Sequence, residues 1–376
     1  MKTYLIDPRN TTKPYNFCLL SALKRKQFPF EFFGYIPRDW QEKSPVRENN
    51  LFLPLSRGIF ESKKIQRSIA NLTQTLEIFF GHLRLRQKTD KNTTLHFLWL
   101  TVPSIEKYII PHINNAKILH TAHNLLPHRE HPRNFQNLKK IYSLMRKIIV
   151  HDNETRNAFY EIFDLKVPVI TLPHGNVETF YKTFDDTTNS ESQNFYHQKL
   201  PELNRPIFLF MGPVKKYKGY ETLLSAIDIL NKKNLNYSVV VKDKIKEKRK
   251  NLYSLPASPP YSKLGLIYRN TDAVILPHTK ISQSITLFEA GYFKKTVIVS
   301  NIGGLKETVR DEKDGFIFEK GSSSSLANKM ENLIETTSNE IKTLGECFKE
   351  HLIKQYSWDS ITEKLIGIYQ DFEFLN

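Results

Sequence analysis

The residue pattern best suited to chemistry lies near the middle of the chain, where a short apolar run meets a basic turn. The run 207–211 has the length of a buried parallel strand, and Gly212 ends it. A helical pattern begins after Gly219. The turn between them carries three lysines: Lys215, Lys216 and Lys218. Free N–H groups at a helix N-terminus and lysine charges both attract phosphate. The turn could therefore hold a phosphate group, or it could be an ordinary exposed basic turn.

The elements that would position this turn recur along the whole chain. Short apolar runs alternate with helical patterns, which predicts an α/β protein with parallel sheets wrapped by helices. We expect an N-terminal domain at 1–180, a polar linker or loop at 181–204 and a C-terminal domain at 205–355. A last helical segment at 356–376 is expected to cross back to the N-terminal domain.

The charge of the chain is uneven. The 376 residues have a net charge of +16, and residues 1–175 alone hold 27 Lys and Arg against 14 Asp and Glu. Such a basic half indicates an anionic partner, which could be a nucleic acid, a membrane surface or an anionic substrate, although a solvated basic face is an alternative. Cys18 and Cys347 are the only cysteines, which argues against a disulfide framework and favours a reducing compartment.

The lengths of the apolar runs in the sequence bear on where the protein is located. The first ten residues lack the apolar core of a secretory signal, and no run approaches the roughly 18 apolar residues of a membrane span. We therefore expect a cytoplasmic protein, either free or peripheral on the inner face of the cell membrane. The segment 56–87 predicts a long amphipathic helix or helix pair with basic residues. Such a segment could dock on an anionic bilayer, but more often it is a crossover helix packed on a sheet.

Five segments, in this order, carry a resemblance to a known family. They read ILHTAHNLLPH, VITLPHGNVETFY, FLFMGPVKKYKGYETLLSAI, TDAVILPH and SQSITLFEAGYFKKTVIVSNIGGLKETVRDEKDGFIFEKG. Together they resemble the retaining GT-B glycosyltransferases of group 1, often called family 4, over most of residues 95–372. The resemblance implies two Rossmann-like domains with parallel sheets facing across a cleft. It also implies a nucleotide-diphospho-sugar co-substrate on the C-terminal half, an acceptor on the N-terminal half, and neither a cofactor nor a metal.

The resemblance also implies site residues. Three would be catalytic: His123, Lys218 and Glu289. The donor would be bound by Gly212, Lys215, Lys216, Lys218, Ser282, Gln283, Ser284, Thr286 and Glu289. On the substrate side the candidates are Asn124 and His174.

Each catalytic candidate has a chemical reason. Lys218 would clamp the departing diphosphate, because the leaving group needs positive charge. Glu289 would accept hydrogen bonds from the ribose hydroxyls, unless it is an ordinary acid on a helix surface. His123 follows a strand, at the edge where ligands of α/β sheets bind, and could bond a sugar hydroxyl or act as a base. His128 and His131 follow in the same segment. A structural role is the alternative for each histidine, and the spacing does not support a zinc site.

Two features depart from the family pattern. Ile281 stands where relatives carry the first glutamate of an E-x7-E motif, which leaves the sugar contacts to the loop 281–286. The family's glycine-rich loop on the acceptor side is replaced by Asp7 to Tyr15. The absence of the first glutamate weakens the transfer of the family's rules for the donor sugar and for retention to this chain. Both departures suggest a subgroup in which TxHN…PH replaces the more usual motif.

The expected function is glycosyl transfer to a saccharide or lipid-linked saccharide in polysaccharide or glycan biosynthesis. One alternative is a non-catalytic GT-B-like scaffold, since Ile281 replaces an acid. Another is a basic nucleic-acid-binding protein, although no RNP, zinc-finger or helix-turn-helix signature is present. A GT-B epimerase or phosphorylase is a related enzymatic alternative.

Overall fold

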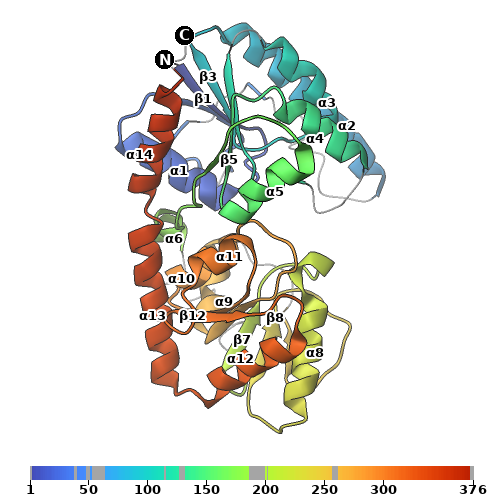
Figure 1. Ribbon diagram of the computed structural model, residues 1–376, viewed down its shortest axis with the longest axis vertical. Coiled ribbons are helices and arrows are strands. Elements are labelled where there is room, and N and C mark those ends of the chain that lie inside the picture. The colour runs from blue at the N-terminus through green and yellow to red at the C-terminus, as the bar shows by residue number, and fades with distance from the viewer. Residues whose placement is uncertain are drawn as a thin grey trace. The chain divides into compact units, whose positions relative to one another are not determined.

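The computed structural model of the chain describes residues 2–37, 40–47, 51–52, 64–113, 116–126, 132–185, 200, 202–255 and 261–372. The chain forms two compact units (Figure 1): Met1–Pro173 with Trp358–Asn376, and His174–Ser357. The units divide earlier in the chain than the predicted boundary at residue 180. Of the predicted linker 181–204, the first residues end helix α6 (Glu178–Phe184) of the second unit, and most of the others lie outside the described residues, as do His128 and His131.

The first unit is built on a parallel sheet with strand order β2-β1-β3-β4-β5-β6. Its strands are β1 (Lys2–Asp7), β2 (Glu31–Gly34), β3 (Thr93–Phe97), β4 (Lys117–Thr121), β5 (Lys147–Val150) and β6 (Val169–Thr171). The strand order reverses between β1 and β3. In doubly wound folds ligands bind at such a switch point, beyond the carboxyl ends of the strands.

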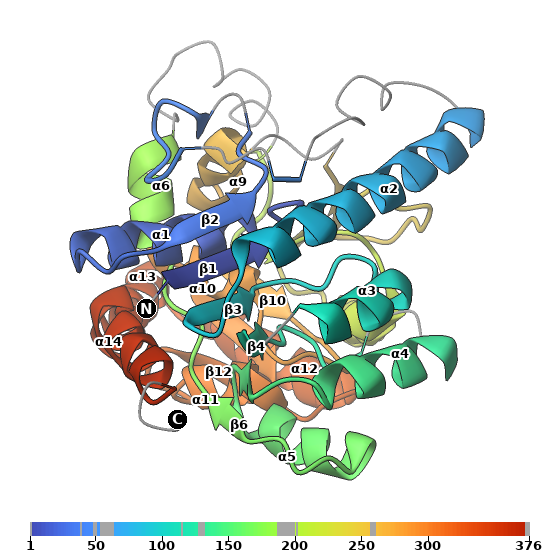
Figure 2. The ribbon, with the colours of Figure 1, turned by 90° about the horizontal axis from the view of Figure 1, so that it is seen from above.

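Helices cover both faces of this first sheet. Figure 2 shows α2 (Lys64–Lys88), α3 (Pro103–Ile109) and α4 (Pro132–Tyr142) along one face, with α1 (Lys13–Arg25) and α14 (Trp358–Gln370) on the other. The end of the chain thus belongs to the first unit, where α14 contacts α1. The segment predicted at 56–87 contains one described helix, α2, and it is a crossover between β2 and β3.

The second unit is built on a parallel sheet with strand order β12-β11-β10-β7-β8-β9. Its strands are β7 (Ile207–Phe210), β8 (Ser238–Val241), β9 (Leu252–Ser254), β10 (Ala273–Leu276), β11 (Thr296–Ser300) and β12 (Gly315–Phe318). Here the order reverses between β7 and β10, so the carboxyl ends of these two strands form the switch point.

Seven α-helices of the second unit are described. They are α6, α8 (Tyr220–Asn231), α9 (Leu264–Arg269), α10 (Ile285–Tyr292), α11 (Gly303–Thr308), α12 (Ser323–Glu335) and α13 (Ser338–Gln355). Buried side chains of β7, β8, α8 and α12 share one hydrophobic core. Two parallel α/β sheets confirm the predicted fold class, while their facing across a cleft stays a prediction. Within the described residues, no helix has the length and apolar character needed to cross a membrane.

Candidate active site

The basic turn predicted from the sequence lies at the switch point of the second sheet. After β7 the chain passes through Gly212 and a 3₁₀ turn, Lys216–Lys218, into α8. Gly219 joins the two with a φ of +68°, and a Cβ there would lie 1.7 Å from the carbonyl oxygen of Pro277, just after β10. Only glycine fits a left-handed position so close to another backbone. The backbone of this turn therefore lies directly against the end of β10.

Lys218 is the lysine of the turn that points back to the end of β7. Its Nζ donates to the carbonyl oxygen of Met211 at 3.1 Å. A Cβ at Gly212 would lie 2.7 Å from the same Nζ. Burial lowers the pKa of Lys218 to about 8, Glu289 opposes this, and Lys215 lowers it further. Lys215 and Lys216 are exposed. Of the three predicted lysines, Lys218 is thus the one held in place.

A further lysine, Lys242, belongs to the same charge cluster and was missed by the sequence analysis. It directly follows β8, the neighbour of β7 in the sheet, and its N–H donates to the carbonyl oxygen of Phe210 at 3.0 Å. Burial lowers the pKa of Lys242, and the charge of Glu289 opposes this. Lys242 also lowers the pKa of Lys218. The carboxyl ends of β7 and β8 therefore carry more positive charge than negative.

Glu289 lies on α10 and is buried. Its Oε1 accepts a hydrogen bond from the hydroxyl of Tyr181 on α6, and its Oε2 accepts one from Tyr268 on α9, both at 2.7 Å. Burial, and then the charge of Glu289, raises the pKa of both tyrosines well above its usual value, so they stay protonated and donate. Glu289 is thus not an ordinary acid on a helix surface. A carboxylate has about four acceptor positions, and the two tyrosines use two of them. The remaining positions could accept from ribose hydroxyls, and this contact stays a prediction.

The loop predicted to contact the donor connects β10 to α10 and is fixed at both ends. The N–H of Thr279 donates to the carbonyl oxygen of Tyr217 in the basic turn at 2.8 Å. The carbonyl oxygen of Ser282 accepts from the N–H of Gly304 at 2.8 Å. The side chain of Gln283 donates to Thr308 Oγ1 at 3.4 Å. Three hydroxyl residues of the loop and of the first turn of α10 are buried: Ser282, Ser284 and Thr286. The loop therefore joins the basic turn to α11.

His174 belongs to the second unit and packs beside the Glu289 helix. Its Nδ1 donates to the carbonyl oxygen of Gly175 at 2.7 Å. Its ring stacks on Phe288, with 4.8 Å between ring centroids. These contacts agree with the structural role left open for this histidine. A role on the substrate side stays a prediction.

His123 follows β4 in the first unit and sits among aromatic rings. Tyr15 meets it edge-on at a centroid distance of 4.8 Å, and Trp99 stacks on it at 5.7 Å. Tyr15 lies at the start of α1, and Trp99 follows β3. His123 is buried and the adjacent Asn124 is half-buried. The rings converge at the carboxyl ends of β3 and β4, next to the switch point of the first sheet.

The orientation of His123 is set by a second histidine that the sequence analysis missed. Nδ1 of His151 lies 3.0 Å from the carbonyl oxygen of Leu172, and Nε2 of His151 lies 2.8 Å from Nδ1 of His123. Burial lowers the pKa of His151, so its ring is neutral near pH 7. A carbonyl only accepts, so His151 donates through Nδ1 and accepts through Nε2. His123 must then donate from Nδ1, which leaves the lone pair on its Nε2.

His151 could have been found by the signal that identified His123. His151 directly follows β5, and His123 follows β4 after one intervening residue. Lys242 also directly follows a strand, β8. It begins the charged stretch 242–250, so its position did not distinguish it from the surface lysines beside it. By contrast, His120 is buried and hydrogen-bonded to the carbonyl oxygen of Phe97, and burial lowers its pKa to about 4.

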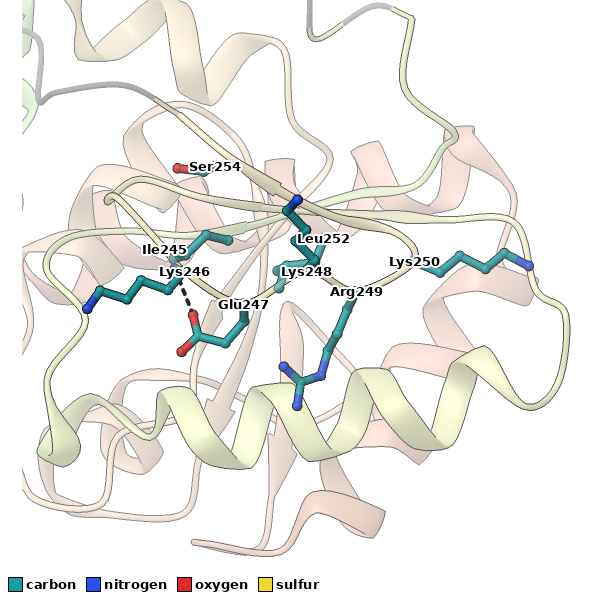
Figure 3. A pocket seen from close by; sticks show the side chains of 8 residues that line it. All are labelled: Ile245, Lys246, Glu247, Lys248, Arg249, Lys250, Leu252 and Ser254. Atoms are coloured by element: carbon teal, nitrogen blue, oxygen red, sulfur yellow. Dashed lines mark hydrogen bonds between the residues drawn. The ribbon is translucent and has the colours of Figure 1, made fainter.

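An open cavity of about 520 Å³ lies along the loop between β8 and β9 (Figure 3). It is lined by residues 245–250, Leu252 and Ser254, and none of the predicted site residues lines it. Arg249 bonds Asp228 on α8 at 2.8 Å. Because its lining is a charged surface loop, we place the site at the switch point and not in this cavity. Within the described ranges, no three His, Cys, Asp or Glu side chains are grouped to hold a metal, and metal independence stays a prediction.

Comparison with known proteins finds a family model that matches part of the chain. Residues 192–350 match the family model described as "Glycosyl transferases group 1". The chain is 24% identical over 240 residues to the capsular polysaccharide biosynthesis glycosyltransferase CapM of Staphylococcus aureus. That match spans 61% of this chain and 60% of CapM, and the match to a glycogen synthase of Thermodesulfovibrio yellowstonii spans only 35% of that relative.

Solved structures share the fold. A sucrose-phosphate synthase from Thermosynechococcus elongatus superposes with a TM-score of 0.71 at 16% identity, covering 100% of both chains. Anabaena Alr3699/HepE in complex with UDP-glucose superposes with a TM-score of 0.68 at 13% identity, covering 99% of this chain and 100% of that one. At such identities the likeness establishes the fold, and the fold is that of GT-B glycosyltransferases.

Proposed function

We propose that this chain, whose residues 192–350 match the family model "Glycosyl transferases group 1", transfers a sugar from a nucleotide-diphospho-sugar to a saccharide or lipid-linked saccharide. The observation that carries the proposal is the charge cluster at the carboxyl ends of β7 and β8, next to the switch point of the second sheet. Lys218 and Lys242 stand at the ends of β7 and β8, with Lys215 close enough to affect the pKa of Lys218. A cluster with excess positive charge at this place suits a diphosphate.

In the proposed reaction one bond breaks and one bond forms. The bond between the anomeric carbon of the sugar and the diphosphate oxygen breaks, and the diphosphate leaves with the electron pair. A bond forms between the anomeric carbon and an acceptor oxygen, which loses its proton. Lys218 and Lys242 stabilise the charge that develops on the diphosphate, so no protein acid is required at the leaving group.

The donor is proposed to bind through the same elements. HepE has been crystallised with UDP-glucose, which supports a UDP-sugar as the first donor to test here. The loop 281–286 has Ile281 where an acid would be expected, so hydroxyls and N–H groups would contact the sugar. Glu289 would take the ribose hydroxyls through acceptor positions that Tyr181 and Tyr268 do not use.

The acceptor is proposed to meet His123. The lone pair on its Nε2 can accept the proton of an acceptor hydroxyl, or a hydrogen bond from a sugar hydroxyl. Asn124 would contribute an amide beside it. CapM is named for capsular polysaccharide biosynthesis, which supports a saccharide acceptor made in polysaccharide or glycan assembly. We propose this work to be metal-independent and to take place in the cytoplasm.

Binding and turnover of sugar nucleotides test the proposal together. A thermal-shift screen with UDP-, GDP-, ADP- and CMP-sugars should raise the melting temperature for one nucleotide class, because ligands that bind only the folded state stabilise it. The same donor should then release its nucleoside phosphate when acceptor is added. Binding without any release would favour a non-catalytic scaffold, and release that requires inorganic phosphate would favour a phosphorylase. A salt-dependent shift of RNA or DNA, with no response to any nucleotide, would favour the nucleic-acid alternative.

A further inference from the structure

Helix α2 carries two apolar stripes on opposite sides. One stripe is buried against the first sheet and includes Ile78, His82 and Leu85. The other has the spacing i, i+3, i+4, i+7 and is exposed: Leu76 (43%), Phe79 (38%), Phe80 (50%) and Leu83 (36%). A crossover helix needs only the first stripe to pack on its sheet. The second stripe is therefore an apolar surface that the fold of the first unit does not require.

Basic side chains flank the exposed stripe. At the helical period of about 100° per residue, Arg84 and Arg86 fall on the two sides of the stripe, and both are exposed. The surrounding sequence is also basic, because residues 64–147 contain 14 Lys and Arg against four Asp and Glu. An apolar stripe between cationic flanks is the pattern of a helix that lies in a membrane interface.

The neighbouring helices extend this surface. Helix α3 contacts α2 and α4, and Figure 2 shows the three along the same face of the first sheet. On α3, Tyr108 is 59% exposed. The ammonium groups of Lys107 and Lys140 lie 4.6 and 5.4 Å from the centre of its ring. An exposed tyrosine held between lysines combines an aromatic body with positive charge, as interfacial side chains do.

We propose that this face, formed by the exposed stripe of α2 with Tyr108, Lys107 and Lys140, docks on an anionic lipid bilayer. The positive charge of this face favours an anionic bilayer as its partner. A second copy of the chain would bring two basic faces together, which is electrostatically unfavourable. An anionic bilayer offers negative headgroups to the lysines and arginines, and an apolar layer to Leu76, Phe79, Phe80 and Leu83. The inference goes beyond the proposed reaction, because vesicle binding needs neither donor nor acceptor.

Flotation of the purified full chain with vesicles tests the proposal. The chain should float with vesicles of phosphatidylglycerol and phosphatidylcholine and stay unbound with phosphatidylcholine alone. The double variant Phe79→Ser/Phe80→Ser should bind the anionic vesicles at least about tenfold more weakly, because each phenylalanine loses apolar burial in the interface. Arg86→Ala should weaken binding about fivefold, and added salt should reduce this difference.

The matched control is Ile162→Ser/Ile353→Ser, which removes apolar side chains of similar exposure (38% and 41%) elsewhere on the chain. It should bind vesicles like the wild type. Thermal unfolding and nucleotide binding are measured on every variant, so a folding defect or a failed donor site is distinguished from lost docking. The proposal is overturned if the wild-type protein does not bind anionic vesicles. It is also overturned by a Phe79/Phe80 variant that binds like the wild type, or by one that instead loses a dimer seen in light scattering.

Discussion

Nε2 of His151 lies 2.8 Å from Nδ1 of His123, and this contact fixes which nitrogen of His123 keeps a lone pair. We therefore predict that His151 acts as a positioning residue for the reaction. His151→Phe should lower kcat at least about tenfold with little change in KM for the donor, because His123 loses its acceptor and can adopt the wrong tautomer. His151→Gln should recover most of the activity, since its amide can donate to Leu172 and accept from His123.

Steady-state kinetics on the two variants check this prediction. A large fall in kcat with unchanged KM in the phenylalanine variant, rescued in the glutamine variant, is the expected pattern. Equal losses in both variants that follow their melting temperatures would reduce His151 to a structural role.

His123 itself should matter more for turnover than for donor binding. His123→Ala should reduce kcat by about a hundredfold or more if Nε2 serves as a base, while the Kd for the nucleotide stays close to that of the wild type. Titration calorimetry with the nucleoside diphosphate and initial rates with donor and acceptor measure the two quantities. Equal losses in both would assign His123 to binding alone.

Lys218 gives the donor site a characteristic pH dependence. Burial lowers the pKa of Lys218 to about 8, so its charge is present below that pH and lost above it. A diphosphate binds the charged form. The affinity should therefore fall about tenfold or more as the pH rises from about 7.5 to about 9.5, since each unit above the pKa removes about nine tenths of the remaining charged form. Lys218→Arg should keep its charge and flatten this fall.

Substitution to alanine tests the same residue at one pH. Lys218→Ala should lower kcat/KM by the equivalent of about 2–4 kcal/mol, as expected for the loss of a preorganised charge. Lys232→Ala, at the other end of α8, is the matched control and should behave as wild type. Nucleotide affinity that is independent of both pH and Lys218 would remove this lysine from the site.

Glu289 could contact the ribose, or it could serve only to hold Tyr181 and Tyr268. Two variants distinguish these roles. Glu289→Gln should weaken nucleotide binding if Glu289 contacts the ribose. It should also lower the melting temperature, because an amide nitrogen cannot accept the hydroxyl of Tyr181 or Tyr268. Tyr268→Phe leaves the carboxylate in place and should affect stability by about 1–3 kcal/mol with nucleotide affinity retained. If both variants lose stability and neither loses affinity, Glu289 is a buried anchor between α6, α9 and α10.

Local patterns in the sequence were sufficient for much of the fold. The run predicted at 207–211 appears as β7, and the strand predicted before His123 appears as β4. Gly219 joins the basic turn to α8, and its left-handed conformation and its close contact with Pro277 exclude a side chain. Other elements escaped. Helix α13 and strand β9 were not among the elements predicted from the sequence. Strand β9 is short and paired only on one side, so its sequence carries little pattern.

The site was harder to predict because its contacts join distant parts of the chain. Residues 181 and 289 are 108 positions apart, and no local pattern reveals that one hydroxyl reaches the other's carboxylate. His151 and Lys242 follow strands as His123 and Gly212 do, yet their neighbours in sequence resemble ordinary helix starts and charge runs. The sequence thus located the ends of the strands, whereas the partners at those ends became visible only in three dimensions.

The central claim is transfer from a nucleotide-diphospho-sugar, and one measurement tests it most directly. The purified chain is incubated with a sugar-labelled donor of the class found by thermal shift, together with a membrane and saccharide extract as acceptor. We expect nucleoside diphosphate to be released in an amount equal to the label attached to acceptor, and Lys218→Ala to slow both by the equivalent of about 2–4 kcal/mol. A folded, nucleotide-binding wild type that transfers no label and releases no nucleoside diphosphate with any donor would contradict this claim.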